Sequence, residues 1–263
     1  MRRNVLRELL KSGKASLGTH IASPWPTTIE IIGRSGVFDY VEFMSEYSAY
    51  SLHDLDNLHR AVELFPEMTS MVKLEQEPRT YLTMKYMSAG FQNVLFADVR
   101  TAADAEECVR AVRAESPASG GRRGAGMGRD VGILFEGASP AFVEASKEAV
   151  VAIMIEKKEA VENLEAILSV PGIDMINFGA SDYSMSVGLA GQRDHPSIKE
   201  AEEYAIKTAL KMGVVPRAEA TEPAEMEHYL AMGVKHFCVG WDLYTLYCWC
   251  RDNGGAMREL LSP

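Results

Sequence analysis

The chain has 263 residues, of which 47% are hydrophobic and 24% are charged, a composition typical of a globular protein. A chain of this length buries enough surface to fold without a disulfide or a metal. The net charge of -10 argues against a nucleic-acid partner or an anionic membrane surface.

The N-terminal segment MRRNVLRELLKSGK predicts an amphipathic helix, because Glu8 interrupts the apolar run that a signal peptide would need. No stretch approaches the roughly 18 apolar residues of a membrane helix. The cysteines are expected to be small core residues in a reducing compartment; they are Cys108, Cys238, Cys248 and Cys250. We therefore expect a cytoplasmic protein.

Short apolar runs then alternate with helical patterns to the end of the chain. The predicted strands are Leu17–Ala22, Tyr40–Met44, Ser70–Leu74, Asn93–Val99, Val150–Ile155, Met175–Phe178, Val214–Ala218 and His236–Gly240. The clearest helical patterns between them cover residues 26–36, 51–65, 101–115 and 157–172.

Several of these strands are apolar on both faces, as parallel strands covered by helices must be. Eight strand–helix units in about 260 residues have the size and rhythm of a (β/α)₈ TIM barrel in the α/β class. We expect a single domain over residues 1–263. The alternative is a doubly wound open sheet, which would want a glycine-rich phosphate turn after an early strand; GTHIASPWP is not one.

Two segments depart from this rhythm. Residues 115–142 are rich in Gly, Ser and Arg, and we expect them in the active-site region or at a subunit contact, with a disordered linker as the alternative. The C-terminal WDLYTLYCWCRDNGGAMRELL is aromatic and apolar over most of its helical faces. A terminal helix of that kind predicts packing on a neighbouring subunit.

The fifth and sixth predicted strands each end close to a carboxylate, Glu156 and Asp182. Catalytic groups of such barrels lie at the carboxyl ends of the strands, so the two side chains should share one mouth. A hard divalent cation would relieve their mutual repulsion. The simpler alternatives are that Glu156 favours a helix N-terminus and that Asp182 is an N-cap.

The same region carries a family resemblance. Glu156 is followed by a helix, then by VPGID, GASDYSMSVG and GQRDHP. This order is similar to the signature region of the class II, metal-dependent pyruvate aldolases, the HpcH/HpaI aldolase family. Similar features appear in residues 88–113 and in GGRRG at residues 120–124, so the resemblance runs from about Leu17 to Leu246.

The resemblance implies a barrel of the phosphoenolpyruvate/pyruvate-binding type. It implies Mg²⁺, Mn²⁺ or Co²⁺ at Glu156 and Asp182, stabilising a pyruvate enolate as a Lewis acid. Backbone amides around Ala180 and Ser181 would receive the substrate carboxylate. The family also implies a homo-oligomer, a trimer or a hexamer.

The departures from the family pattern indicate a divergent branch. The segment FMSEYSAYS keeps an acidic residue as Glu46, but Tyr47 stands at the family's histidine position. Lys73 stands where the family places an arginine over the enolate oxygen, and Met154 replaces a glutamine. Lys73 still supplies positive charge, without the planar fork of arginine.

Proton transfer is the step that these departures leave open. Tyr47 is a poor base at neutral pH, since its unperturbed pKa is about 10, but it could donate a hydrogen bond or orient water. Proton transfer could instead move to His20, at the end of the first strand, or to a metal-bound water. A structural role for His20 is equally open.

Several further residues have weaker assignments. Glu75 and Arg79 could contact substrate or form an ion pair at a helix start. Arg123 in GGRRG is a candidate for the substrate carboxylate, because of its planar fork. The remaining histidines are expected outside the chemistry: His53, His59 and His228 on solvated helix faces, and His195 in a structural or subunit-contact role.

The sequence therefore predicts a metal-dependent lyase that cleaves or forms a carbon–carbon bond next to a 2-oxo acid, with an aldehyde as the second small molecule. One alternative is 2-oxo-acid decarboxylation or a related enolate reaction. The other is a non-catalytic barrel that binds a 2-oxo acid. Neither nucleic acid nor membrane is expected as a partner.

Overall fold

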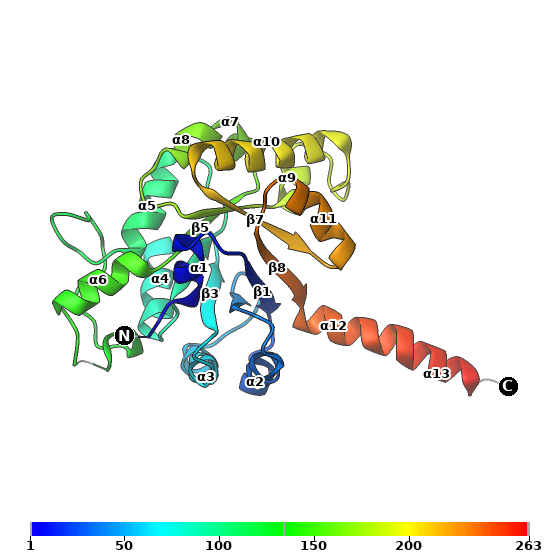
Figure 1. The fold of residues 1–263 in the computed structure, drawn as a ribbon, viewed down its shortest axis with the longest axis horizontal. Coiled ribbons are helices and arrows are strands. Elements are labelled where there is room, and N and C mark those ends of the chain that lie inside the picture. The colour runs from blue at the N-terminus through cyan, green and yellow to red at the C-terminus, as the bar shows by residue number, and fades with distance from the viewer. Residues whose placement is uncertain (1, 134, 262–263) are drawn as a thin grey trace.

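The computed structural model describes residues 2–133 and 135–261. Its centre is a closed barrel of eight parallel strands, each paired with its neighbours in chain order and the last paired with the first (Figure 1). The strands are β1 Ser16–Ile21, β2 Tyr40–Met44, β3 Thr69–Leu74, β4 Asn93–Phe96, β5 Val151–Ile155, β6 Met175–Phe178, β7 Val215–Ala220 and β8 His236–Trp241. The predicted (β/α)₈ barrel is confirmed, and the open-sheet alternative is wrong.

Helices surround this barrel and connect its strands (Figure 1). They are α1 Val5–Lys11, α2 Pro26–Ser35, α3 Leu52–Glu63, α4 Arg79–Ser88, α5 Ala102–Val112, α6 Pro140–Glu148, α7 Lys158–Glu162, α8 Leu164–Leu168, α9 Ala180–Ser186, α10 Pro196–Met212, α11 Pro223–Ala231, α12 Asp242–Trp249 and α13 Gly255–Leu260. The pattern over residues 157–172 predicts one helix, but α7 and α8 are separated at Asn163, whose side chain donates to the Arg100 carbonyl.

The amino-terminal mouth of the barrel is closed by α1. Leu6 is fully buried against the inner core. Arg7 forms an ion pair with Asp174, which precedes β6, and donates to the carbonyls of Glu148 and Ala149, which precede β5. Ligands can therefore approach the barrel interior only from the opposite, carboxyl-terminal side.

The barrel interior is filled by side chains, as in other barrels of this size. Tyr40 is fully buried there and donates to the Phe237 carbonyl. A Cβ at Gly18 would lie 2.2 Å from the Tyr40 ring, so β1 needs a glycine at this position. The outer core, between strands and helices, is apolar and includes Phe43, Val72 and Ile153.

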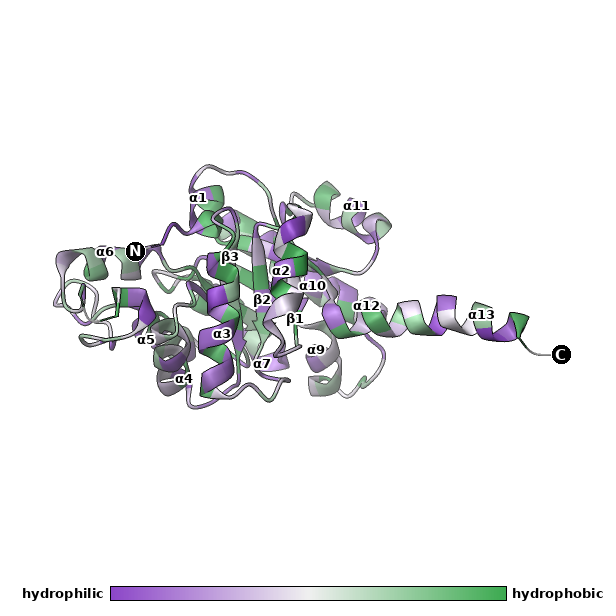
Figure 2. Cartoon of the chain, turned by 90° about the horizontal axis from the view of Figure 1, so that it is seen from below, coloured by the Kyte–Doolittle hydropathy of each residue, from purple (hydrophilic) through white to green (hydrophobic). Residues whose placement is uncertain are grey.

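The last helices do not cover the barrel. Together with the π-helical turn Cys250–Gly254, α12 and α13 form an extended rod that runs away from the body of the molecule (Figure 1). Hydrophobic and hydrophilic residues alternate along this rod (Figure 2), and Leu246, Trp249 and Leu260 are all more than half exposed. Among the described residues, no helix has the length and apolar character needed to cross a bilayer.

Two predictions about single residues are wrong, and one alternative for a segment is excluded. His59 was expected on a solvated face, but it is 1% exposed, because Phe91 and Gly90 cover it. Cys108 and Cys238 are buried as predicted, whereas Cys250 is exposed on the terminal rod. Residues 115–133 and 135–142 pack against the barrel, with Val131 and Phe142 buried, so they do not behave as a linker.

Candidate active site

A cavity of about 190 Å³ opens at the carboxyl ends of the strands. Six of the residues singled out by sequence line it together: Tyr47, Lys73, Glu156, Ala180, Ser181 and Asp182. They come from β3, the ends of β5 and β6, and the loop after β2. The fold therefore collects groups that lie more than 130 positions apart in the sequence.

Glu156 follows β5 directly and is 2% exposed. Its Oε1 accepts a hydrogen bond of 2.7 Å from the backbone N–H of Asp98. A Cβ at Gly179 would lie 2.6 Å from Glu156 Cβ and 2.8 Å from Oε2, so only glycine lets the end of β6 approach this closely. Burial raises the pKa of the Glu156 carboxyl above its usual value, although Lys73 and the Asp98 N–H oppose that rise.

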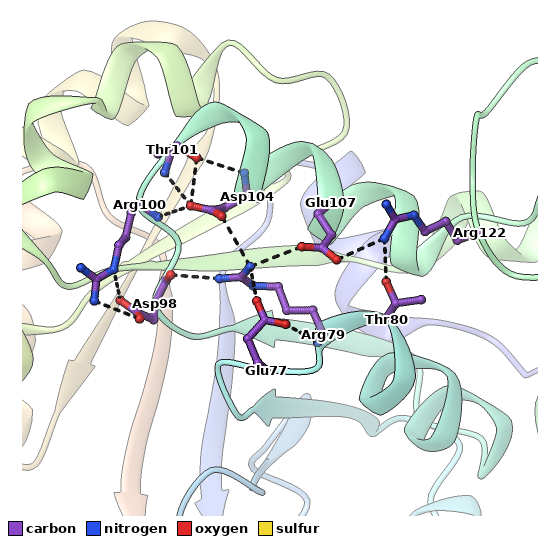
Figure 3. Close-up of polar contacts among 9 residues, drawn as sticks. All are labelled: Glu77, Arg79, Thr80, Asp98, Arg100, Thr101, Asp104, Glu107 and Arg122. Atoms are coloured by element: carbon purple, nitrogen blue, oxygen red, sulfur yellow. Dashed lines mark hydrogen bonds and ion pairs between the residues drawn. The ribbon is translucent and has the colours of Figure 1, made fainter.

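The Asp98 loop that holds Glu156 is itself held by a buried arginine (Figure 3). Arg79 is 4% exposed, and its Nη2 donates to the Asp98 carbonyl at 3.1 Å. Its Nη1 lies 2.9 to 3.5 Å from the carboxylates of three residues, which are Glu77, Asp104 and Glu107. Arg79 therefore acts on the site through the backbone around Asp98 and is not one of the residues that line the cavity.

Asp98 has an unusual backbone conformation within this loop. Its φ of 50° lies in the left-handed region, which non-glycine residues seldom adopt. Arg100 pairs with its carboxylate at 2.9 Å (Figure 3). This turn ends β4 at Phe96 and not at Val99, and it points the Asp98 N–H at Glu156.

Asp182 lies in the first turn of α9, about a third exposed, and its Oδ1 pairs with Lys157 Nζ at 2.7 Å. Lys157 is the neighbour of Glu156 in the chain. The two carboxylates of the cavity thus differ in their surroundings: Glu156 is buried and fixed by the backbone, whereas Asp182 is about a third exposed. Carboxylate oxygens at the edge of a water-accessible cavity are the donors that Mg²⁺ and similar hard ions take, with water in their remaining positions.

Lys73 ends β3 on the opposite side of the cavity and is 6% exposed. Its Nζ lies 2.7 Å from Glu46 Oε2 and donates to Tyr47 Oη at 2.9 Å. Burial lowers the pKa of the Lys73 ammonium, but the negative groups around it, Glu156 foremost, raise that pKa above its ordinary value. Lys73 is therefore a fixed positive charge at neutral pH.

Tyr47 is more than half exposed at the cavity edge. Burial of its hydroxyl raises the pKa to about 12, although Lys73 acts in the opposite direction. A phenol with this pKa remains protonated at neutral pH. Its oxygen accepts from Lys73, and Glu46 is a second hydrogen-bond partner, so a ligand in the cavity would compete with Glu46 for the hydroxyl proton.

Comparison with known proteins agrees with this geometry. The model of the HpcH/HpaI aldolase/citrate lyase family matches residues 53–247. The chain belongs to this family. Its relatives include a 2-keto-3-deoxy-L-rhamnonate aldolase of Klebsiella pneumoniae, 30% identical over 92% of this chain and 89% of the relative. A hydroxypyruvate/pyruvate aldolase of Pseudomonas aeruginosa is 27% identical over 97% of this chain and 93% of the relative.

A solved structure of the family has the same fold. The HpcH/HpaI aldolase from Desulfitobacterium hafniense is 25% identical and superposes with a TM-score of 0.86, covering 97% of this chain and 96% of that one. Since the family model and both relatives cover most of the chain, the HpcH/HpaI barrel accounts for nearly all of its length.

Four of the residues singled out from the sequence as catalytic or substrate-binding are not among those that line the cavity; they are Glu46, His20, Glu75 and Arg123. His20 lies in an adjoining cavity, and its proton-transfer role stays a prediction. Glu75 accepts a hydrogen bond from Ser45 Oγ. Arg123 is paired with Asp130 and lines a separate cavity of about 480 Å³ beside the residues that precede β4 and β5. Within one chain Arg123 therefore does not meet Glu156.

The sequence did not predict a buried ion pair inside the barrel. Arg217 on β7 lines the cavity, is 2% exposed, and pairs with the fully buried Glu42 on β2. Burial disfavours the Glu42 carboxylate, but Arg217 and His20 hold its pKa below the usual value. The sequence does show Glu42 within the strand YVEFM and Arg217 within the strand VPRAEA. Nothing in the sequence indicates that these two residues form a pair.

Other residues of the cavity wall come from the loop before α10, from α10 itself and from α11. They are Arg193, Lys199, Glu202 and Tyr229, and Glu202 accepts a hydrogen bond of 2.8 Å from Tyr229 Oη. The wall carries four cations, which are Lys73, Arg193, Lys199 and Arg217, and four carboxylates, which are Glu156, Asp182, Glu202 and Glu219. The wall therefore offers both positive groups for an anionic ligand and carboxylates for a cation.

Proposed function

We propose that the protein is a metal-dependent carbon–carbon lyase of the aldolase type, which breaks or forms the bond next to a 2-oxo acid through a pyruvate enolate. The observation that carries the proposal is that Glu156, Asp182 and Lys73 line one small cavity at the carboxyl end of the barrel. The relatives named as a 2-keto-3-deoxy-L-rhamnonate aldolase and a hydroxypyruvate/pyruvate aldolase support this reaction class.

Glu156 and Asp182 would hold the divalent cation, Mg²⁺, Mn²⁺ or Co²⁺. The donor set fits, because both groups are carboxylates and Gly179 keeps the ends of β5 and β6 close. Once bound, such an ion supplies Lewis acidity, which withdraws electrons from a 2-oxo acid and favours its enolate. Lys157 would release Asp182 and provide a nearby positive charge.

The rest of the site would orient the substrate and balance its charge. The Lys73 ammonium, held by Glu46, places a fixed positive charge where negative charge develops on the enolate oxygen. Tyr47 would donate its hydroxyl proton to a substrate oxygen. Backbone N–H groups at Ala180 and Ser181, in the first turn of α9, would bind the substrate carboxylate, since that turn leaves them without helical acceptors.

Pyruvate exchange tests the enolate directly. The protein is incubated with pyruvate in deuterated buffer, with and without Mn²⁺, and loss of the methyl proton signal is followed by NMR. We expect exchange that depends on the metal and disappears in Glu156→Gln. Glu165→Gln, the same charge change at an exposed position of α8, is the control that keeps full exchange.

Two results would count against this function. Exchange that does not require metal, or that survives in Glu156→Gln, would remove the assigned site. Metal binding without any exchange would favour a non-catalytic 2-oxo-acid-binding barrel. Release of carbon dioxide from 2-oxo acids without an aldehyde would instead favour the decarboxylase alternative.

We also propose that the protein is a homo-oligomer, a trimer or a hexamer, in which the rod of α12 and α13 packs on a neighbouring subunit. In a barrel of this kind the helix after β8 normally covers β8 and β1. Here an apolar cavity of about 550 Å³ lies in that place, between α2 and α11, and includes Ile31, Ile32 and Met226. The rod of a second copy has the exposed apolar residues to fill it.

Light scattering tests this assembly. Leu246→Asp, on the rod, is expected to lower the mass of the particle, whereas Leu64→Asp, an equally exposed leucine at the end of α3, should not. A wild-type protein that is monomeric at micromolar concentration would overturn the assembly and leave the chemistry untouched.

A further inference from the structure

A second group of metal-binding side chains lies inside the barrel, apart from Glu156 and Asp182. His20 on β1, Glu42 on β2 and Cys238 on β8 place one ligand atom each within 4.8 Å of one another. All three are buried, with 7%, 0% and 0% of their surfaces exposed. The ion pair with Arg217 accounts for Glu42 alone, and the candidate proton-transfer role of His20 does not require a thiol beside it.

Two of the three ligands are already oriented by groups behind them. His20 Nδ1 donates to the Gly240 carbonyl at 2.7 Å, which leaves Nε2 facing Glu42 Oε1 at 3.6 Å. Arg217 donates to the other oxygen of that carboxylate, Oε2, and makes a longer contact of 3.4 Å to Oε1. Metal-binding histidines and carboxylates in proteins are fixed from behind in this way, by a carbonyl on the far ring nitrogen and by a donor on the far oxygen.

The donor set selects the kind of ion. Cysteine, histidine and one carboxylate are ligands of Zn²⁺, whereas Mg²⁺ takes oxygen alone. On a tetrahedral Zn²⁺ these ligand atoms would lie about 3.3 to 3.6 Å apart. The His20–Glu42 separation of 3.6 Å already matches, and the Cys238 sulfur lies within 4.8 Å of both ligand atoms.

A second cavity gives an ion access to these three side chains. A cavity of about 200 Å³ is lined by His20, Cys238 and Glu219, and it shares Glu219, Met44 and Arg193 with the catalytic cavity. Glu219 Oε1 lies 3.8 Å from His20 Nε2 and is half exposed, so it or a water can complete a fourth position.

We propose that His20, Glu42 and Cys238 form a Zn²⁺ site, distinct from the carboxylate site at Glu156 and Asp182. Without the ion, the His20 imidazole is protonated. Burial lowers the pKa of His20, but Cys238, Glu219 and Glu42 together raise it to about 10. Zn²⁺ binds a thiolate and a neutral imidazole, so its affinity should rise with pH.

The position of the site indicates what the ion does. β1 and β8 form the closing pair of the barrel, and their register shifts between Gly18 and His20. An ion bound to β1, β2 and β8 at once would fasten this irregular seam next to the catalytic cavity. The ion should therefore stabilise the fold as well as bind.

Cobalt binding tests the proposal, because a thiolate on Co²⁺ gives a near-ultraviolet charge-transfer band that oxygen ligands do not give. The metal-free full-length protein is titrated with Co²⁺, then with Zn²⁺, and Zn²⁺ is counted by elemental analysis after gel filtration. We expect the band in wild type and in Glu156→Gln, its displacement by Zn²⁺, and a higher Tm with Zn²⁺.

Cys238→Ala should lose the band and bind Zn²⁺ at least about 100-fold more weakly, since loss of a direct ligand exceeds the effect of losing an outer partner. Cys108→Ala, an equally buried cysteine on α5, is the matched control that keeps both properties. If Cys238→Ala does not fold, His20→Gln replaces it, with circular dichroism to verify folding.

A wild-type protein that gives no cobalt–thiolate band, or a folded Cys238→Ala or His20→Gln that retains it, would overturn the proposal. These outcomes are independent of pyruvate exchange. The cobalt experiment can therefore overturn the zinc site without affecting the proposed aldolase function, and pyruvate exchange can overturn the aldolase function without affecting the zinc site.

Discussion

The two halves of the barrel interior are built differently. From β3 to β6 the inner core is mainly apolar, with Met71, Leu95 and Met175 fully buried. From β7 through β8 and β1 to β2 it is polar, with Arg217 and Glu42 paired at its centre. The stability of the β3–β6 half depends on packing, which tolerates small changes of side-chain volume. The stability of the other half depends on an ion pair, and loss of either partner leaves a buried charge without compensation.

The largest effect should come from breaking that pair. Arg217→Met leaves the Glu42 carboxylate buried without its partner, and we expect the free energy of unfolding to fall by about 3–5 kcal/mol. The double variant Glu42→Leu with Arg217→Met should recover most of that loss. Denaturant unfolding of both proteins measures the difference.

The apolar half supplies the contrast. Leu95→Ala should cost about 2–5 kcal/mol through the cavity it leaves, with no single second substitution that restores it. If Arg217→Met were neutral, or the double variant no better than the single one, the pair would not be what distinguishes the two halves.

The positive charge of Lys73, at the edge of the apolar half, can be removed by a substitution that keeps an apolar side chain of similar length. Lys73→Met should slow metal-dependent pyruvate exchange by about 100- to 1000-fold, as loss of a charge-stabilising donor does in other enzymes. Lys73→Arg should retain much more of the rate. Because Lys73 also lies beside the buried Glu156 and lowers its pKa, circular dichroism verifies that Lys73→Met is folded. A rate unchanged in Lys73→Met would remove this residue from the chemistry.

Histidines sharpen the comparison through pH. Outside the barrel, burial together with the nearby Arg2 and Arg129 lowers the pKa of His59 to about 3. Its unfolded pKa is about 6.5, so below that pH the unfolded chain takes up the proton first. Stability should therefore be full above about pH 6.5 and fall by up to about 1.4 kcal/mol per pH unit toward pH 3.

His59→Asn should flatten this pH dependence between pH 7 and 5, whereas His53→Asn, at an exposed position of the same helix, should leave it unchanged. Equilibrium unfolding at several pH values is the measurement. Equal slopes in wild type and His59→Asn would mean that this imidazole is charged in the folded protein.

The smallest effect concerns the Tyr47 hydroxyl. Tyr47→Phe removes one hydrogen bond to a ligand, worth about 0.5–1.5 kcal/mol, so exchange should slow by about 3- to 10-fold. A loss as large as that of Lys73→Met would instead give the hydroxyl a part in proton transfer.

Most of the fold followed from the sequence. β2 and β6 have the predicted bounds, because turn residues and polar positions delimit their apolar runs. β4 is shorter than predicted, since Asp98 adopts a left-handed conformation that residue type does not reveal. His59 was misplaced because the loop that covers it, at Gly90 and Phe91, is remote in sequence.

The candidate site was predicted in part. Glu156 and Asp182 follow strands, and position on a strand is what a local pattern can indicate. Glu42 and Arg217 lie 175 positions apart, so their pairing depends on barrel closure and register. Sequence patterns can place residues at the mouth of a barrel, but they do not indicate which inward side chains meet across it.

The hydrogen bond from Asp98 to Glu156 comes from the main chain, and this affects how the site can change over time. Any residue except proline carries the same N–H, so the identity of residue 98 can drift while its task persists. Glycine would even adopt the left-handed φ more easily than aspartate. The hydrogen bond that supports Glu156 can thus be conserved through the backbone conformation, without conservation of the residue type at position 98.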